Sequence, residues 1–162
     1  MLNIKIKDSF KLIFAVSFLS LVFAYSIEYI LGYQPCNLCL IERIPYWLSI
    51  ILITINFIFK KNDKFLILLL MLLFFFSFII SIYHFGIEQG FFDESTVCGL
   101  QNTTKIISKE EILKQMQERT ISCKDVTFRI LGFSLTTINI FLSLIILTLL
   151  IKNFTHYEKD RN

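Results

Sequence analysis

Four long runs of apolar residues, separated by polar segments of unequal length, dominate the pattern of this chain. They cover about residues 10–31, 40–59, 65–87 and 130–151. Each run is close to the ~20 residues that an α-helix needs to cross the hydrocarbon core of a bilayer. The pattern therefore predicts an all-α protein, a four-helix transmembrane bundle that forms a single integral membrane domain over its 162 residues.

The longest polar segment, residues 88–129, separates the third run from the fourth. Within it, Ser108 and Glu111 have the spacing of a helix capping box. Ile112 and Met116 follow at helical spacing, so we expect a short amphipathic helix in this loop. Two interpretations stay open for it: a helix that rests on the membrane surface, and a small packing helix without membrane contact.

Composition and charge agree with a membrane protein. The chain is 55% hydrophobic and only 18% charged, and its net charge of +3 comes mostly from lysines that flank the apolar runs. We therefore expect contact with lipid and none with nucleic acid. The first run is longer than the 7–15 apolar residues of a signal peptide, and no Ala-x-Ala site follows it, so we expect it to remain as a span.

Basic residues indicate the orientation. They are denser in the two tails and in the turn at residues 60–64 than in the long loop, where acidic residues dilute them. Because positive charge marks the cytoplasmic side, we expect both termini in the cytoplasm and the long loop outside.

A Cys-x-x-Cys motif, Cys36 to Cys39, follows Pro35 and directly precedes the second run. On a helix the two cysteines share a face, and Arg43 lies on the same face one turn beyond Cys39. A helix N-terminus and a nearby guanidinium both favour the reactive thiolate. Arg43 has a second interpretation, as an interfacial anchor that extends to the head groups.

Cys98 and Cys123 lie in the long loop. From their neighbours, a structural disulfide and an exposed reactive thiol at Cys98 are equally good interpretations. With the predicted orientation all four cysteines face the outer compartment, where disulfides persist. Four thiolates could also hold zinc. The oxidising compartment and the lipid-edge position disfavour this, so we expect no metal.

His84 lies near the outer end of the third run, and Glu88 follows four residues later. One helix face thus carries a proton donor and a carboxylate, which suits a site where a quinone takes up two protons. The other interpretation is a pair of ordinary interfacial residues.

Several stretches together resemble the DsbB family of membrane disulfide-bond formation proteins. They are Gln34–Cys39 with the following Glu42-Arg43, then Tyr83–Glu88, then Cys123 with Leu131–Leu135 and Asn139. With four spans and two loop cysteines, the resemblance covers nearly the whole chain.

The resemblance implies a four-helix bundle in the bacterial inner membrane, with its cysteines facing the periplasm. Such a protein reoxidises a soluble periplasmic dithiol oxidase (DsbA-like) and passes the electrons to a membrane quinone. Whether that quinone is ubiquinone or menaquinone stays open. His84 and Glu88 fall by position near the quinone pocket.

The resemblance also implies roles for the cysteines. Cys98 forms the mixed disulfide with the soluble partner, and Cys123 resolves it and engages Cys36. Cys39 then interacts with the quinone ring, and Arg43 supports the bound quinone.

Two alternatives remain at this point. A structural or adaptor membrane protein with two static disulfides would have the same spans and cysteines. A protein like vitamin K epoxide reductase also has four helices and a Cys-x-x-Cys motif, but that family places the motif late in the bundle, whereas here it precedes the second span.

Overall fold

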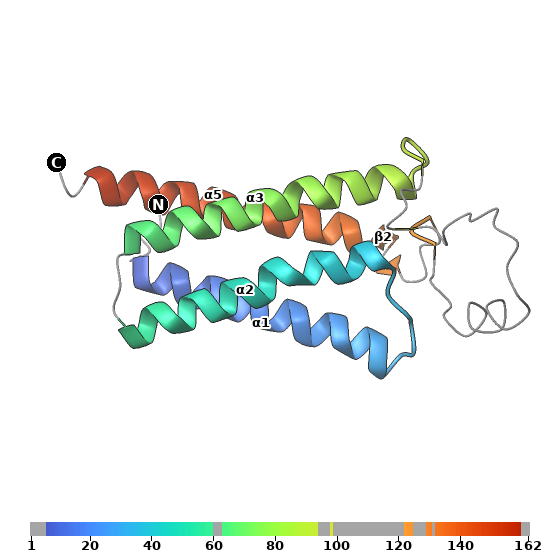
Figure 1. Cartoon of the computed structure of the whole chain (residues 1–162), viewed down its shortest axis with the longest axis horizontal. Helices are drawn as coiled ribbons and strands as arrows, with labels where there is room; N and C mark the ends of the chain where they lie inside the picture. The colour runs from blue at the N-terminus through green and yellow to red at the C-terminus, as the bar shows by residue number, and fades with distance from the viewer. Residues whose placement is uncertain are drawn as a thin grey trace, which may run out of the picture.

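The computed structural model describes residues 6–59, 63–93, 98, 122–124, 129–130 and 132–159. Its long helices are α1 (Ile6–Tyr29), α2 (Asn37–Phe59), α3 (Asp63–Glu88) and α5 (Leu135–Lys159). All four are long and apolar enough to cross a membrane. They lie side by side as a bundle (Figure 1), which confirms the predicted four-helix transmembrane architecture.

The helices pack as two pairs, because α1 lies mainly against α2 and α5 mainly against α3. Helices α2 and α3 join the pairs, while α1 and α5 have few contacts with each other. The start of α2, the end of α3 and the start of α5 all lie at one end of the bundle (Figure 1). Residues far apart in the sequence therefore meet at that end.

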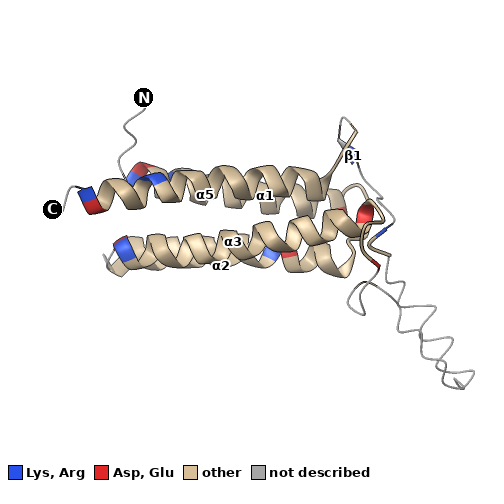
Figure 2. Cartoon of the chain, turned by 90° about the horizontal axis from the view of Figure 1, so that it is seen from above, with Lys and Arg blue, Asp and Glu red and all other residues tan. Residues whose placement is uncertain are grey.

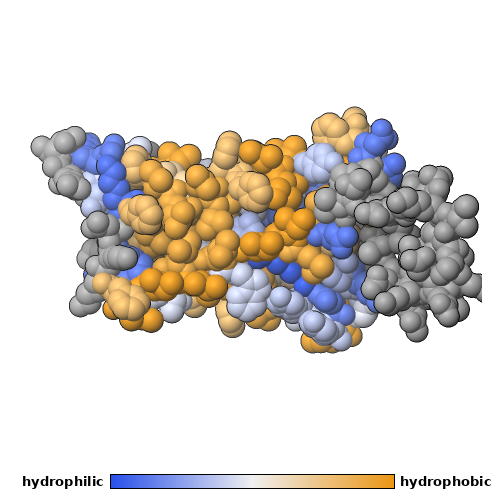
Figure 3. All heavy atoms as spheres, viewed as in Figure 1, coloured by the Kyte–Doolittle hydropathy of each residue, from blue (hydrophilic) through white to orange (hydrophobic). Residues whose placement is uncertain are grey.

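The outer surface suits a lipid environment. An apolar band covers the middle of the bundle and hydrophilic residues gather towards its ends (Figure 3). Charged residues, coloured on the ribbon, are likewise sparse along the middle of the helices (Figure 2). Large apolar side chains of the helices, such as Phe18, Phe75 and Phe76, are exposed. The chain is therefore a multi-pass membrane protein.

Small polar side chains connect the helices inside the bundle. Their hydrogen bonds join Ser9 to Asn153, Ser49 to Ser17, Ser143 to Ser77 and Asn139 to Ser81. Lipid tails are as apolar as leucine, so helices in a membrane associate through close packing and such hydrogen bonds. These pairs fix which faces of the helices meet.

The fourth span differs from the prediction at both ends, because α5 starts at Leu135 and not at residue 130, and ends at Lys159 and not at residue 151. The preceding residues form a small hairpin of β1 (Arg129–Ile130) and β2 (Phe133–Ser134). Gly132 has a φ of +88°, a conformation that glycine adopts without strain. The Ser134 hydroxyl then accepts a hydrogen bond from the Thr137 N–H at 3.2 Å and caps α5.

The other three spans agree with the predicted ranges to within a few residues. The amphipathic helix expected from Ser108 and Glu111 lies outside the described residues.

Candidate active site

The site begins at the N-terminus of α2, where Cys36 is the capping residue. Its carbonyl accepts from the Leu40 N–H at 3.2 Å, and its Sγ accepts from the Cys39 N–H at 3.3 Å. The two sulfur atoms are 2.8 Å apart and both residues are free cysteines. Cys36 is buried, whereas Cys39 is partly exposed. Helix capping thus holds the thiols together.

The surroundings of Cys36 favour its thiolate. The thiol of Cys39 donates a hydrogen bond to the Cys36 sulfur, and this contact lowers the pKa of Cys36 most. Burial raises that pKa, but the neighbouring His84 lowers it further. The net result is a pKa of Cys36 well below its ordinary value.

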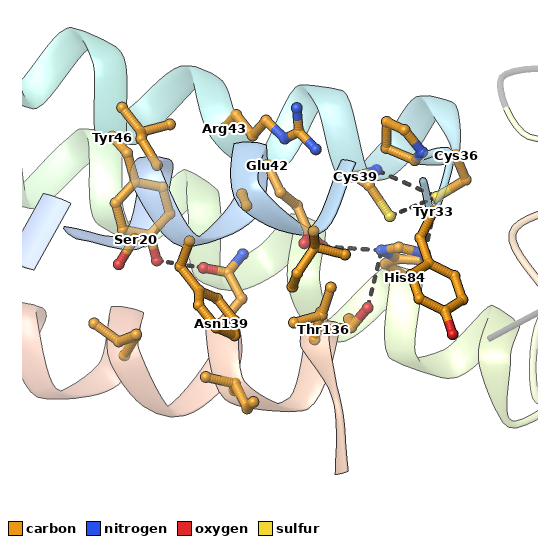
Figure 4. A pocket seen from close by; sticks show the side chains of 18 of the residues that line it. Ser20, Tyr33, Cys36, Cys39, Glu42, Arg43, Tyr46, His84, Thr136 and Asn139 are labelled. Carbon is orange, nitrogen blue, oxygen red and sulfur yellow. Dashed lines mark hydrogen bonds and ion pairs between the residues drawn. The ribbon is translucent and has the colours of Figure 1, made fainter. Parts of the chain in front are cut away.

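His84 lies at the centre of a polar cluster contributed by three helices (Figure 4). Its Nε2 is 3.5 Å from the Cys36 Sγ, and its Nδ1 is 3.1 Å from Glu42 Oε1 and 3.2 Å from Thr136 Oγ1. The Thr136 hydroxyl donates to Glu88 Oε1 at 2.6 Å, so its oxygen accepts from His84. Nδ1 therefore carries a hydrogen, and Nε2 faces the sulfur.

Glu88, which lies on the same helix as His84, is the last member of the cluster. Its Oε1 lies 3.9 Å from His84 Nε2. Its Oε2 is buried and has no hydrogen-bond partner among the described residues. Buried polar atoms are nearly always paired, so this oxygen indicates a place for a ligand, a proton or water.

Arg43 lies one turn beyond Cys39, as its spacing predicts, but extends towards α1. It forms an ion pair with Glu28, and its guanidinium lies 4.8 Å from the centre of the Tyr25 ring. The α1 helix thus provides the partners that a charge near the bilayer requires.

The loop cysteines lie against this cluster. Cys98 and Cys123 form a disulfide and are 1% and 2% exposed. They pack with Cys36, Leu38 and Ile87. Of the two interpretations of Cys98, the structure therefore has a buried, paired cysteine and not an exposed thiol.

A cavity of about 180 Å³ connects these groups. Its polar wall is formed by Cys36, Cys39, Glu42, Arg43, His84, Glu88 and Cys123, which include every site residue predicted from the sequence except Cys98. Its apolar wall comes from α1 and α5 and includes Leu21, Phe23, Ile27, Leu135, Ile138 and Leu142. Such a cavity suits a flat, mainly apolar ligand with polar atoms at its edge.

Sequence reasoning assigned no role to Glu42, Tyr46 or Thr136, all of which line the cavity. A signal existed for the first two, because they follow Cys39 by three and seven residues on one helix face. Thr136 gave no signal, since it meets His84 across 52 residues of sequence.

Comparisons with known proteins identify the family. A family model described as disulfide bond formation protein DsbB matches residues 7–152. An uncharacterised protein of Rickettsia prowazekii (strain Madrid E) is 30% identical over 150 residues, which cover 89% of this chain and 87% of that protein. No solved structure matches the chain. The chain therefore belongs to the DsbB family of disulfide bond formation proteins.

Proposed function

We propose that this protein reoxidises a soluble periplasmic dithiol oxidase of the DsbA type and passes the electrons to a quinone in the bacterial inner membrane. The observation that carries the proposal is the cavity, in which a free thiol pair, a loop cysteine and an apolar wall meet. A thiol pair in that place has access both to the loop disulfide and to a lipid-soluble acceptor.

Thiol exchange begins at the loop. A thiolate of the partner attacks Cys98, the Cys98–Cys123 bond breaks, and Cys123 leaves as a thiolate while a mixed disulfide forms. Cys123 then attacks Cys36 of the oxidised Cys36–Cys39 pair, and Cys39 leaves as a thiolate. Thiolate attack on a disulfide sulfur is the ordinary route of such exchange.

The second half returns the loop to its oxidised state. The partner's other thiolate displaces Cys98 and leaves with its own disulfide. Cys98 then displaces Cys36 from Cys123, so the loop disulfide reforms and Cys36 and Cys39 end as the reduced pair. This end state has the same bonds as the described structure, with Cys98 joined to Cys123 and the other two cysteines free.

Reoxidation of Cys36 and Cys39 needs a strong acceptor. A DsbA-like oxidant has a potential near −120 mV, and a glutathione-like pool near −200 mV, so reoxidation by that pool is uphill by about 3.7 kcal/mol for two electrons. Quinone, when bound, supplies the acceptor of two electrons and two protons.

The residues around the cavity fit a quinone. Arg43 can donate to a carbonyl oxygen, and the unpaired Oε2 of Glu88, when protonated, can donate to another. The apolar residues of α1 and α5 exclude water from the ring. His84 Nε2 faces the Cys36 sulfur and is positioned to take its proton.

The order of the relay is tested by trapping. With Cys123→Ala, Cys98 is a free thiol that attacks the disulfide of the oxidised soluble partner. We expect a mixed disulfide between Cys98 and the partner to accumulate, because Cys123 is no longer present to displace it. Non-reducing electrophoresis measures the complex.

The matched control is Cys98→Ala, which keeps Cys123 and should give no complex. Trapping that persists in Cys98→Ala and disappears in Cys123→Ala would reverse the order of the two loop cysteines.

A further inference from the structure

Three ligand atoms of the kinds that bind zinc meet at the start of α2. The sulfurs of Cys36 and Cys39 and a ring nitrogen of His84 all lie within 4.8 Å of one another. The four-cysteine zinc site considered from the sequence does not form here, because Cys98 and Cys123 are joined to each other. The ligand set that the fold assembles is a different one.

We propose that the reduced Cys36–Cys39 pair binds Zn²⁺ together with His84, and that this ion reversibly withholds the thiols from exchange. Binding is a proton exchange and not a redox step: Zn²⁺ forms two Zn–S bonds and one Zn–N bond, and any proton on either sulfur or on His84 Nε2 is released. Oxidation of the pair to a disulfide removes both thiolate ligands, so the site exists only in the reduced protein.

The distances support a tetrahedral site. With Zn–S near 2.3 Å and Zn–N near 2.0 Å, a sulfur and a nitrogen ligand are about 3.5 Å apart and two sulfurs about 3.8 Å. The distance from Cys36 Sγ to His84 Nε2 is 3.5 Å. The two sulfurs are 2.8 Å apart and must separate by about 1 Å, which a small rotation of the partly exposed Cys39 side chain allows.

The hydrogen bonds of His84 suit a metal ligand. Its Nδ1–H donates to Glu42 Oε1 at 3.1 Å, so Nε2 faces the sulfurs and can bind the ion once it has given up its proton. This carboxylate–histidine arrangement is the usual support for a zinc-bound histidine. Glu42 thus acts as a positioning residue for the metal ligand.

Glu88 borders this three-ligand set, and its carboxylate can hydrogen-bond to water in the fourth position of the ion. Its Oε1 lies 3.9 Å from His84 Nε2 and is occupied by Thr136, whereas its buried Oε2 has no partner among the described residues. Two cysteines and a histidine, with water in the fourth position, are an ordinary set of zinc ligands.

The test uses the full chain with Cys98→Ser and Cys123→Ser, so that Cys36 and Cys39 are its only thiols. After anaerobic reduction, Co²⁺ is added as a visible probe and Zn²⁺ as its competitor. We expect one Co²⁺ per chain with the visible bands of a tetrahedral, thiolate-bound ion, displacement by Zn²⁺, and no such bands in the oxidised protein.

Variants locate the ligands. His84→Ala should weaken Zn²⁺ binding by at least about a hundredfold, and Glu42→Gln by about 10–100-fold through the loss of support for the ring. His156→Ala is the matched control, because the chain has 2 histidines and this one lies near the far end of α5; it should leave binding unchanged.

A second measurement does not depend on variants that affect folding. In the reduced wild-type protein, Zn²⁺ should protect Cys36 and Cys39 from maleimide, and EDTA should restore their labelling. Absence of the thiolate–Co²⁺ bands, equal binding by oxidised protein, or full binding by a folded His84→Ala variant would each overturn the proposal. Quinone turnover without added metal is a separate measurement, so failure of the zinc site leaves the proposed function unaffected.

Discussion

At the scale of single residues, the two cysteines of the motif have the same chemistry in different surroundings. Cys36 is buried beside His84, and it accepts hydrogen bonds from both the thiol and the backbone N–H of Cys39. Cys39 is the donor and is partly exposed. Because of this asymmetry, Cys36 is the residue that carries the negative charge. Cys123 packs in the same cluster as Cys36.

This asymmetry predicts a pH dependence. Because the pKa of Cys36 is lowered, its thiolate should persist as the pH falls from 8 to 6, where an ordinary cysteine is only about 0.3% ionised. The ultraviolet absorbance of the thiolate, followed in the reduced protein with Cys98→Ser and Cys123→Ser, measures this. Cys39→Ala removes the main stabilising donor and should move the midpoint of the titration to higher pH. A midpoint that stays in place would show that Cys39 does not set it.

The position of Arg43 predicts that its replacement impairs the use of quinone and leaves thiol exchange nearly unchanged. Arg43→Met keeps much of the apolar stem and removes the charge, so we expect the KM for quinone to rise about tenfold or more, since ~1.4 kcal/mol already corresponds to a factor of ten. Single-turnover exchange between the partner and the loop disulfide should change little. Steady-state kinetics with varied quinone tests the first half.

The control for Arg43 is Lys64→Met. Lys64 also forms an ion pair, with Glu158, but it lies at the start of α3, the end of the bundle away from the cavity. An equal rise of the KM in both variants, or in neither, would make Arg43 an interfacial anchor.

At the scale of the elements, the start of α5 decides where Thr136 lies. Hydrophobicity alone assigns residues 130–134 to the span, but in the structure the described ones among them belong to the hairpin of β1 and β2. Ser134 caps the helix that follows. Thr136 then faces His84 and Glu88. If the helix began at residue 130, there would be no turn at Gly132. Thr136 would then not be placed beside His84 and Glu88.

The hydrogen bond with which Ser134 caps α5 therefore predicts an effect on stability. Ser134→Ala should lower the free energy of unfolding by about 1 kcal/mol, because the Thr137 N–H loses its partner. Ser134→Asn, which also caps well, should restore most of it. Unfolding by a denaturing detergent in mixed micelles measures both variants; equal stability of the alanine and asparagine variants would contradict the capping role.

At the scale of the whole molecule, the ends of the bundle differ in kind. The cysteines and the buried polar cluster lie where α2 begins and α3 ends, and the start of α1 and the end of α5 lie at the opposite end (Figure 1). A disulfide relay requires that the cysteine end face the oxidising compartment.

This asymmetry predicts the topology. Reporter fusions after Arg161 and within residues 60–64 should indicate the cytoplasm, and a fusion at Thr103 should indicate the periplasm, because basic residues concentrate in the tails and in the 60–64 turn. Paired reporters, one active on each side of the membrane, measure it. A cytoplasmic signal at Thr103 would exclude the relay.

Local patterns in the sequence determined the four helices and the groups that each one carries. The apolar runs predict spans, and short spacings place Cys39 with Arg43 and His84 with Glu88, because a helix brings residues three or four apart onto one face. The start of the fourth span was wrong by five residues, since hydrophobicity alone does not reveal the turn at Gly132.

Only the tertiary structure decided which of these faces meet. The bond of Thr136 to His84 crosses 52 residues, the ion pair of Arg43 with Glu28 crosses 15, and Cys123 packs with Cys36 although the two are far apart in the sequence. These contacts follow from the rotation and depth of each helix, which close packing and buried hydrogen bonds set between helices. No periodicity within one segment contains that information.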